Sequence, residues 1–317
     1  MSDNLVEDSV LSQYVPGFRA NLNMAPQQTM TKLLDKVDGD LNYDAAGEMF
    51  NADDLLPSDP EDNNSRVPNT PDKFLGFTRR VGAFLGFHDS AWFPIRDKVR
   101  ELEDPTSKAM MNLNAGRWRR TDSAIITAGL GNATNKNDNT GSYTTTALPA
   151  GQLVSSVDVS EAHDAEVVPT DGSDYGMAVG KLIHAGLLLD DSELEGERFL
   201  AWSSQQKADL LRRTPATSRY YAEVMALNAG TIDHFMGFTI VQLPKSRVPL
   251  YVNGNAHNIR SCMAWIKPAI IYKGRPIVNV SIKERADKGN TPQAYYSAEH
   301  GAVRRYDKAV VQIDCKE

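Results

Sequence analysis

Histidine and aspartate side chains that could bind a metal or transfer protons are scattered along the second half of the chain. They are His163–Asp164, His184, Asp190–Asp191 and His234. A zinc enzyme usually takes part of its ligand set from a tight pattern such as HExxH, and none of these residues has that spacing. We interpret the histidines as surface or core residues, and we assign no metal ligand and no cofactor.

Two adjacent serines raise the question of a nucleophile. Ser203 and Ser204 follow a predicted strand and open a predicted helix, as the serine of a nucleophile elbow does. The elbow needs the pattern G-x-S-x-G, whereas Trp202 and Gln205 flank this pair. Ser203 and Gln206 have the spacing of a capping box instead. We therefore predict that Ser203 caps a helix, and we assign no catalytic residue.

Length and composition limit the classes of protein that remain. A chain of 317 residues suffices for one large domain or two modest ones. Its formal net charge of −7 lacks the basic footprint of a protein that reads nucleic acid. If the chain encloses DNA, it does so by lining a container. Cys262 and Cys315 are too few for a disulfide framework, so we expect two reduced thiols.

The N-terminal sequence and the hydropathy pattern bear on targeting. The first residues, MSDNLVEDSV, have neither the basic nor the apolar region of a signal peptide. No apolar run approaches the roughly 20 residues of a membrane span. No long, charge-rich helical leader precedes the rest of the chain, so we expect that no scaffold domain is cleaved from the N-terminus.

An acidic stretch interrupts two apolar segments near the N-terminus. Residues 35–62 carry ten acids against one base, and residues 57–71 hold four prolines. No part of this stretch matches the calcium loop of an EF-hand. Two apolar runs around a polar tip predict a long β-hairpin over about residues 45–93. Because an isolated hairpin is only marginally stable, we expect a neighbouring subunit to support it.

The clearest helix is predicted over residues 104–131. Asp104 can cap it, Pro105 suits its first turn, and Gly129 and Gly131 can end it. Residues 79–120 hold nine bases against five acids. An acidic loop and a basic region in one chain favour head-to-tail contact between copies. The alternative is that these charges only keep the surface soluble. The candidate contact residues are Asp53, Asp54, Asp59, Glu61, Asp62, Phe74, Phe77, Arg79, Arg80, Phe84, Arg117, Arg119 and Arg120.

The rest of the chain mixes short helices with β-strands, which defines an α+β class. Helices are predicted at 174–189, capped by Asp174, from Ser203 to about Arg213, and at 222–229 before Gly230. Strands are predicted from RFLAW at 198–202, FTIVQL at 238–243, and the runs SCMAWI, IVNVSI and KAVVQID after residue 260.

The order of these pieces resembles the Hong Kong 97-type capsid fold of tailed phages, and in particular a phage capsid family of similar length. The resemblance covers most of the chain beyond residue 69. It is carried by NTPDKFLGFTRR (69–80), DKVRELEDPTSKAMMNLNAGRWRRTDSAIITAGLG (97–131), RFLAWSSQQKADLLR (198–212), GTIDHFMGFTIVQLPKSRVP (230–249) and RADKGNTPQAYYSAEHGAVRRYDKAVVQID (285–314).

The resemblance implies a subdivision of the chain and a structural role. The expected parts are an N-terminal arm (1–40), an extended loop (41–95), a peripheral domain with the spine helix (96–150), an axial domain (151–260) and closing strands of the peripheral domain (261–317). The implied role is that of a major capsid subunit without catalytic residues, located in the virion and assembled in the cytoplasm of the host bacterium.

The implied partners are other copies of the chain, arranged in hexamers and pentamers of an icosahedral shell. A portal protein, a separate scaffold protein and, in some phages, a cementing protein would complete the head. Double-stranded DNA would be enclosed without sequence-specific binding, and no membrane is involved. Two alternatives stay open. One is an encapsulin-like nanocompartment shell with the same fold, and the other is a metal-dependent hydrolase that uses the scattered histidines and aspartates.

Overall fold

The computed structural model describes most of the chain after residue 26, and the statements below concern that part. The described residues are 27–44, 46–60, 62, 76–92, 106–137, 140–162, 166, 168–169, 171–252, 254, 257–275 and 279–317. They form two compact units. The first takes its described residues from Gly86–Arg120, Arg275–Glu299 and the stretch up to Thr31. The second comprises Lys32–Leu85, Thr121–Gly274 and His300–Glu317.

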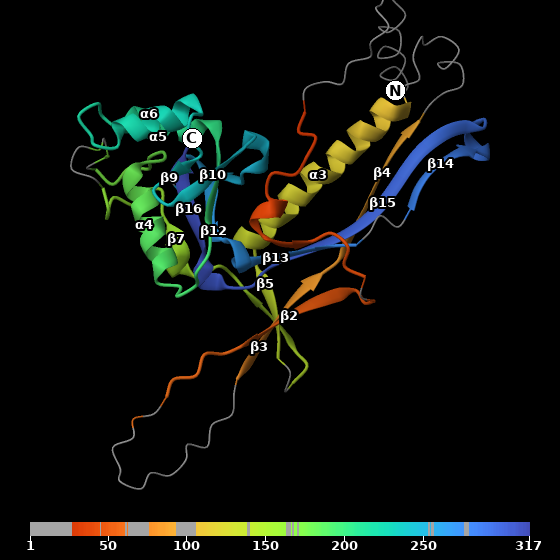
Figure 1. Ribbon diagram of the computed structural model, residues 1–317, viewed down its shortest axis with the longest axis horizontal. Helices are drawn as coiled ribbons and strands as arrows, with labels where there is room; N and C mark the ends of the chain where they lie inside the picture. Colours follow the sequence, from red (N-terminus) through yellow and green to blue (C-terminus); the bar gives the residue numbers. More distant parts are fainter. Residues whose placement is uncertain are drawn as a thin grey trace, which may run out of the picture. The chain divides into compact units, whose positions relative to one another are not determined.

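A seven-stranded mixed sheet forms the centre of the second unit (Figure 1). Its order is β7-β16-β12-β8-β10-β9, with β11 paired to β12. The bounds are β7 (Leu153–Val154), β8 (Arg198–Ser203), β9 (His234–Phe235), β10 (Phe238–Leu243), β11 (Leu250–Val252), β12 (Asn258–Ile266) and β16 (Val310–Lys316). The apolar runs RFLAW, FTIVQL, SCMAWI and KAVVQID thus form strands as predicted. The sheet takes strands from both sides of residue 260.

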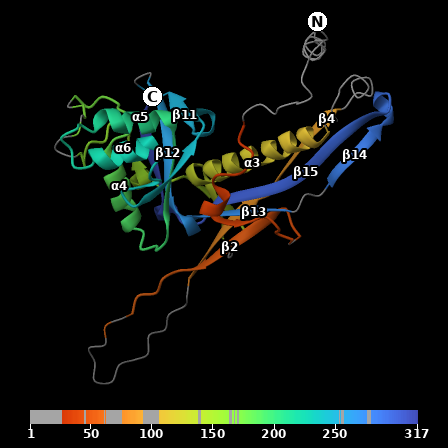
Figure 2. The ribbon, with the colours of Figure 1, turned by 45° about the horizontal axis from the view of Figure 1, so that its top comes forward.

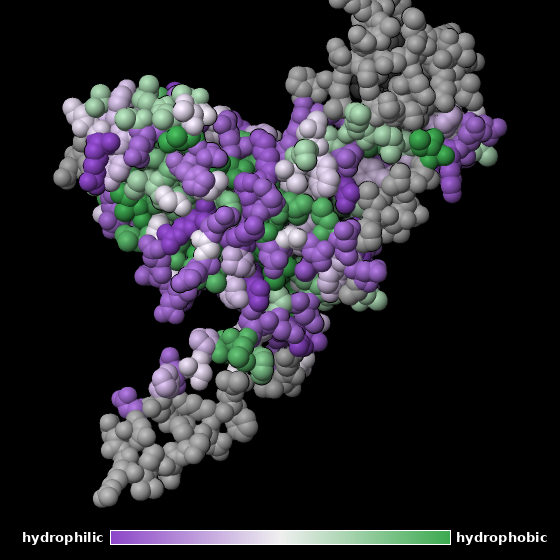
Figure 3. All heavy atoms as spheres, in the orientation of Figure 1, coloured by the Kyte–Doolittle hydropathy of each residue, from purple (hydrophilic) through white to green (hydrophobic). Residues whose placement is uncertain are grey.

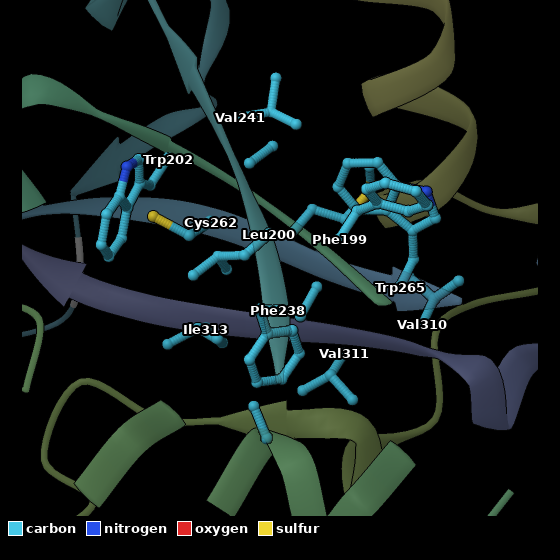
Figure 4. Packing of buried hydrophobic residues seen from close by; sticks show 14 of the residues in the cluster. Phe199, Leu200, Trp202, Phe238, Val241, Cys262, Trp265, Val310, Val311 and Ile313 are labelled. Atoms are coloured by element: carbon cyan, nitrogen blue, oxygen red, sulfur yellow. The ribbon is translucent and has the colours of Figure 1, made fainter. Parts of the chain in front are cut away.

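Large apolar side chains fill both faces of this sheet. Trp202 and Trp265 are fully buried, and the ring of Trp265 lies 5.7 Å from that of Phe199. Phe238 and Ile313 point toward α4 (Val179–Asp190) in Figure 4. Burying one such side chain contributes roughly 1.5–3 kcal/mol, so this sheet holds the main hydrophobic core of the unit.

Three helices accompany the sheet, and their caps follow local sequence signals in two cases. Ser203 and Gln206 form the predicted capping box at the start of α5 (Ser204–Arg213). The third helix, α6 (Tyr221–Ala229), ends at Gly230, whose φ of 76° is left-handed. A side chain is disfavoured in that conformation, which explains why the helix stops there.

The predicted cap of α4 is wrong. The helix begins at Val179, and Ala178 rather than Asp174 occupies the N-cap position. The carboxylate of Glu166 accepts hydrogen bonds from the amides of Val179 and Gly180. An anion at a helix N-terminus satisfies free amides and interacts favourably with the helix dipole. The cap of α4 therefore comes from a residue in the preceding loop, which lies too far from the start of the helix in the sequence to match a helix-cap pattern.

The long helix is confirmed as α3 (Thr106–Leu130), while the proposed cap residues Asp104 and Pro105 lie outside the described residues. Gly131 directly follows the last helical residue, as predicted, whereas Gly129 lies in the final turn of the helix, where a Cβ would be 2.2 Å from the sulfur of Met263. Gly129 thus permits close packing of α3 on β12. Ala115 and Ile125 of the helix are buried, whereas Met111 is exposed.

The first unit places the first part of α3 against a β-ribbon (Figures 1 and 2). Its strands are β4 (Leu85–Trp92), β14 (Asn279–Arg285) and β15 (Thr291–Arg304). Strands β14 and β4 both pair with β15. Leu113 of the helix packs with Ala294 and Tyr296 of β15. This part of the helix therefore lies on a sheet.

The described end of the predicted N-terminal arm is embedded in the core of the second unit. A short 3₁₀-helix, Leu34–Lys36, leads into β1 (Asp38–Asp40), which pairs in parallel with β13 (Ile270–Gly274). Leu33 is fully buried, and the indole NH of Trp265 donates to the carbonyl of Lys36 at 2.9 Å. The C-terminal residues of the arm are thus part of the folded body.

Candidate assembly interface

The expected hairpin has a seven-residue paired stem. Strand β2 (Met49–Leu55) runs antiparallel to β3 (Phe77–Ala83), from the pair Met49–Ala83 to the pair Leu55–Phe77. Strand β3 also pairs with β5 (Ala133–Lys136), which pairs with β6 (Tyr143–Thr146). Figure 1 shows β2, β3 and β5 side by side. The stem ends at Ala83, because the following strand β4 pairs with β15.

An aromatic cluster fixes the base of the stem to its own chain. Phe50 is 1% exposed and lies 5.3 Å from the ring of Phe84 and 6.3 Å from that of Tyr43. Gly82 and Gly301 make room for it, since a Cβ at either would lie within 2.7 Å of the Phe50 ring. The expectation that the whole hairpin needs a neighbouring subunit is therefore wrong for its base.

Ion pairs within the chain compensate two of the acids that were expected to face a neighbour. Asp53 and Arg79 face each other in the β2–β3 register and form a two-pronged ion pair at 2.5 and 3.0 Å. Asp54 accepts two hydrogen bonds of 2.9 Å from Arg305 and one of 3.0 Å from Tyr306. Neither acid thus requires a partner from a second copy.

The electrostatics of Asp54 show which interaction dominates there. Partial burial alone would raise the pKa of the Asp54 carboxyl group, because burial disfavours the charged form. The hydrogen bonds from Arg305 and Tyr306 outweigh burial and hold the pKa of Asp54 below its usual value. Asp54 is therefore a charged anchor between β2 and the turn after β15.

A second ionic cluster joins β3 to the same turn. Arg80 donates to Asp307 at 2.5 Å, and Arg304 donates to the other oxygen of Asp307 at 2.7 Å. Arg304 is fully buried and also donates to the carbonyls of Gly129 at 2.9 Å and Thr146 at 3.3 Å. The turn 304–307 thus fastens the hairpin, the end of α3 and β6 together.

This turn was not among the candidate residues from the sequence. The run RRYD at 304–307 interrupts two apolar strands with three charged residues, and that interruption was the available signal. Its significance depends on contacts with Asp54 and Arg80, which are more than 220 residues away in the chain.

A wide groove lies beside the hairpin stem in the second unit. Its volume is about 1060 Å³. It is lined by Gly76–Arg80 of the hairpin, by Asn135–Asn137 and Thr144 of the β5–β6 ribbon, by Ser192 and Leu194, and by Arg305–Ala309. Five lining residues are cationic, and one, Asp307, is acidic. The groove therefore presents a positively charged wall made by the stem, the ribbon and the turn.

Exposed apolar side chains mark the far end of the stem. Phe77 is 69% exposed, Leu55 is 55% exposed and Leu56 is 45% exposed. Figure 3 shows a hydrophobic patch on the hairpin near the end of its paired stem. Contiguous apolar groups of this kind on a surface often mark an interaction site. We call Leu55, Leu56 and Phe77 the stem patch.

The other candidate contact residues are placed as follows. Arg117 lies with its guanidinium 5.0 Å from the Trp118 ring, Arg119 donates to the side chain of Gln27, and Arg120 is exposed. The tip acids Asp59 and Asp62 are also exposed. Glu61 and Phe74 lie outside the described residues. The structure thus gathers Asp53, Asp54, Arg79, Arg80 and Phe84 in or near the stem.

Residues that suggested metal or acid–base chemistry have local partners. His184 contacts the carboxylate of Asp158, and His234 lies 2.9 Å from both Asp233 and Thr239. His163 lies outside the described residues. No three histidine, cysteine, aspartate or glutamate side chains gather into a metal-binding group anywhere in the described part of the chain. Over the same part, no helix has the length and apolar character to cross a membrane.

Solved structures share this fold across nearly the full chain. A structure titled as the capsid of Ralstonia phage GP4 matches with a TM-score of 0.69 and 13% identity, covering 96% of this chain and 95% of that one. The capsid asymmetric unit of cyanophage Pam1 matches with a TM-score of 0.69 and 10% identity, covering 96% and 97%. A structure from Mycobacterium phage Che8 has a TM-score of 0.61 and 13% identity, covering 95% and 97%.

The family assignment comes from the sequence profile. A comparison with curated proteins finds none that matches. The family model described as phage capsid protein matches residues 10–317. The chain therefore belongs to the phage capsid protein family, and its role is that of a structural protein of the bacteriophage head shell.

Proposed function

We propose that this chain is the subunit of an icosahedral head of a tailed phage, built from hexamers and pentamers and enclosing double-stranded DNA. The observation that supports this most is the hairpin. Its base is fastened to its own subunit by Phe50 and Asp54, whereas its far end exposes Phe77 and carries acids beyond it. A projection that is rigid at its root and apolar at its end is suited to contact a second copy.

The proposed Hong Kong 97-type subdivision uses other bounds than those expected from the sequence, because β16 and most of β12, which were expected in the peripheral domain, belong to the seven-stranded sheet. In this proposal the first part of α3 with β4, β14 and β15 is the peripheral domain, and the seven-stranded sheet with α4–α6 is the axial domain. The β2–β3 hairpin is the extended loop, and the residues before β1 form the N-terminal arm. The proposed role needs no catalytic residue. A portal and a separate scaffold protein would be further partners in the virion, which would assemble in the host cytoplasm.

Assembly of the purified chain tests the proposal. We expect closed shells tens of nanometres wide in electron micrographs, with a scaffold protein added if assembly requires one. Sedimentation that shows only folded monomers or dimers would contradict the proposal. Shells that take up a cargo enzyme instead of DNA would favour the nanocompartment alternative.

Removal of the hairpin tip tests its role directly. Deletion of residues 55–70 leaves Phe50 and Asp54 in place, so we expect a folded and soluble subunit that assembles poorly. The matched control is the full chain under the same conditions, with folding monitored by circular dichroism. Shells of normal yield and heat resistance from the deletion variant would show that the tip does not join subunits.

A further inference from the structure

The cationic wall of the groove is only partly neutralised by its own chain. Arg79, Arg80 and Arg305 form ion pairs with Asp53, Asp307 and Asp54, respectively. Within the described residues, Lys136 and Lys308 take part in no ion pair. The ammonium group of Lys136 lies 5.9 Å from the Tyr143 ring, and Lys308 is exposed on the turn after β15. The groove therefore keeps a net positive charge at these two lysines.

The hairpin of the same chain carries a complementary segment. Residues 57–62 read PSDPED, with three acids and two prolines, and no lysine or arginine occurs from residue 37 to residue 65. The described part of this segment is exposed and lies outside helices and strands. Prolines restrict the backbone to extended conformations, which lowers the entropy lost when such a segment binds a groove.

We infer that the groove beside the stem is the receptor for the acidic segment 57–62 of a second copy of this chain. Lys136 and Lys308 are the residues that face Asp59 and Asp62 of that copy. The inference rests on the proposed function and names the surface with which the hairpin engages.

The contact is heterologous, because the groove and the acidic segment are two different surfaces of the same chain. Each copy then receives one hairpin and offers another. Contacts of this kind close into rings when the rotation between copies permits it. Exposed ion pairs are individually weak, but a ring repeats them once per copy.

Charge reversal tests the inference. In the groove variant Lys136→Glu and Lys308→Glu are combined, and in the tip variant Asp59→Lys and Asp62→Lys are combined. The control combines Lys207→Glu and Lys283→Glu, which changes the net charge by the same amount and sign as the groove variant, at residues outside the groove. We expect the groove variant and the tip variant each to lose about tenfold in shell yield while the control stays within about twofold of the wild type.

Mixing the two defective variants is the decisive measurement. The groove variant carries glutamates in its groove, which can bind the lysines in the tip of the tip variant. The tip variant keeps the wild-type groove, which can bind the wild-type tip of the groove variant. The equimolar mixture should therefore assemble in alternating, even-numbered rings that neither variant forms alone. If the contact lay within one chain, mixing would rescue nothing, and only all four substitutions in one chain would restore shells.

The outcomes separate this inference from the proposed function. If the wild-type chain forms no shells at all, the proposed function fails. If the wild type forms shells and the groove variant forms as many, the groove inference alone fails. A groove variant with normal empty shells that lose packaged DNA would assign the groove to nucleic acid and overturn the inference. Should the glutamates prevent folding, Lys136→Gln with Lys308→Gln gives the same comparison with neutral groups.

Discussion

The Nε–H of Arg305 donates to both carboxylate oxygens of Asp54 at 2.9 Å, and the Nη2 group of Arg305 donates to one of them as well, across 251 positions of the chain. The pair connects β2, the first strand of the hairpin stem, to the turn that precedes β16, the last strand of the chain. Because both side chains are largely shielded from solvent, at 14% and 26% exposure, the pair is a structural anchor rather than a surface charge contact.

Replacement of Asp54 by asparagine should destabilise the subunit. The amide cannot accept both guanidinium bonds as an anion, and Arg305 is left partly buried without its counter-ion, so we expect a loss of about 1–3 kcal/mol in the free energy of unfolding. Asp53→Asn is the matched control, because Asp53 is 50% exposed and its pair should contribute under about 1 kcal/mol. Urea denaturation of the soluble subunits measures both changes, and equal losses would contradict the anchor role.

The same residue should make stability depend on pH in the acidic range. The pKa of Asp54 is lower in the folded chain than its reference value of 3.8, so the folded state binds fewer protons than the unfolded state in this range. Its contribution is present above that reference pKa and is lost as the pH falls through the lower folded pKa. The stability difference between wild type and Asp54→Asn should therefore shrink below about pH 4. A difference that grows on acidification would contradict this sign.

Gly82 should tolerate no side chain. A Cβ at this position would lie 2.2 Å from the Phe50 ring, and Phe50 is enclosed by the aromatic cluster, so Gly82→Ala should destabilise the subunit by about 1–3 kcal/mol. Gly186→Ala is the control, because this helical glycine has nothing within 4 Å of the added Cβ. That control should gain about 0.5–1 kcal/mol. Thermal melts of the two variants should shift in opposite directions.

Substitution of Phe77 should impair assembly without affecting folding, whereas substitution of Phe50 should impair folding itself. Phe77 is 69% exposed, so Phe77→Ala should change subunit stability by less than about 0.5 kcal/mol and yet reduce the shell yield severalfold. Phe50 is 1% exposed, so Phe50→Ala should remove about 3–5 kcal/mol. Denaturation curves and shell yields measured on the same preparations decide this. Normal assembly of the Phe77 variant would show that the stem patch is not an interface.

Short sequence patterns correctly predicted the helices and strands that depend mainly on residues close to one another in the chain. The buried runs that became β8, β10, β12 and β16, the capping box of Ser203 and the long helix α3 all follow from periodicity and caps. Asp174 was wrongly predicted to cap the start of α4, because Glu166 reaches that end from a loop that has no periodic pattern. Instead, Asp174 is buried against His257 at 2.7 Å.

The sequence identified the acidic and basic residues of the candidate interface, but it did not predict which acid pairs with which base. Asp53 and Asp54 looked like charges in need of a neighbour, because nothing near them in the sequence is basic. Their partners are Arg79, which the strand register places opposite Asp53, and Arg305, which only the tertiary fold brings close. The groove depends on the same long-range contacts and so has no local signature.

The fully buried guanidinium of Arg304 has a consequence for the dynamics of α3. The last carbonyl groups of a helix have no partner within the helix and usually allow its final turn to fray. Here Arg304 binds the carbonyls of Gly129 and Gly131, so the final turn can open only if a buried charge also loses its ligands. Amide hydrogens there should exchange with solvent at the rate of global unfolding instead of local opening. The C-terminal end of the long helix is then among the slowest-exchanging parts of the subunit.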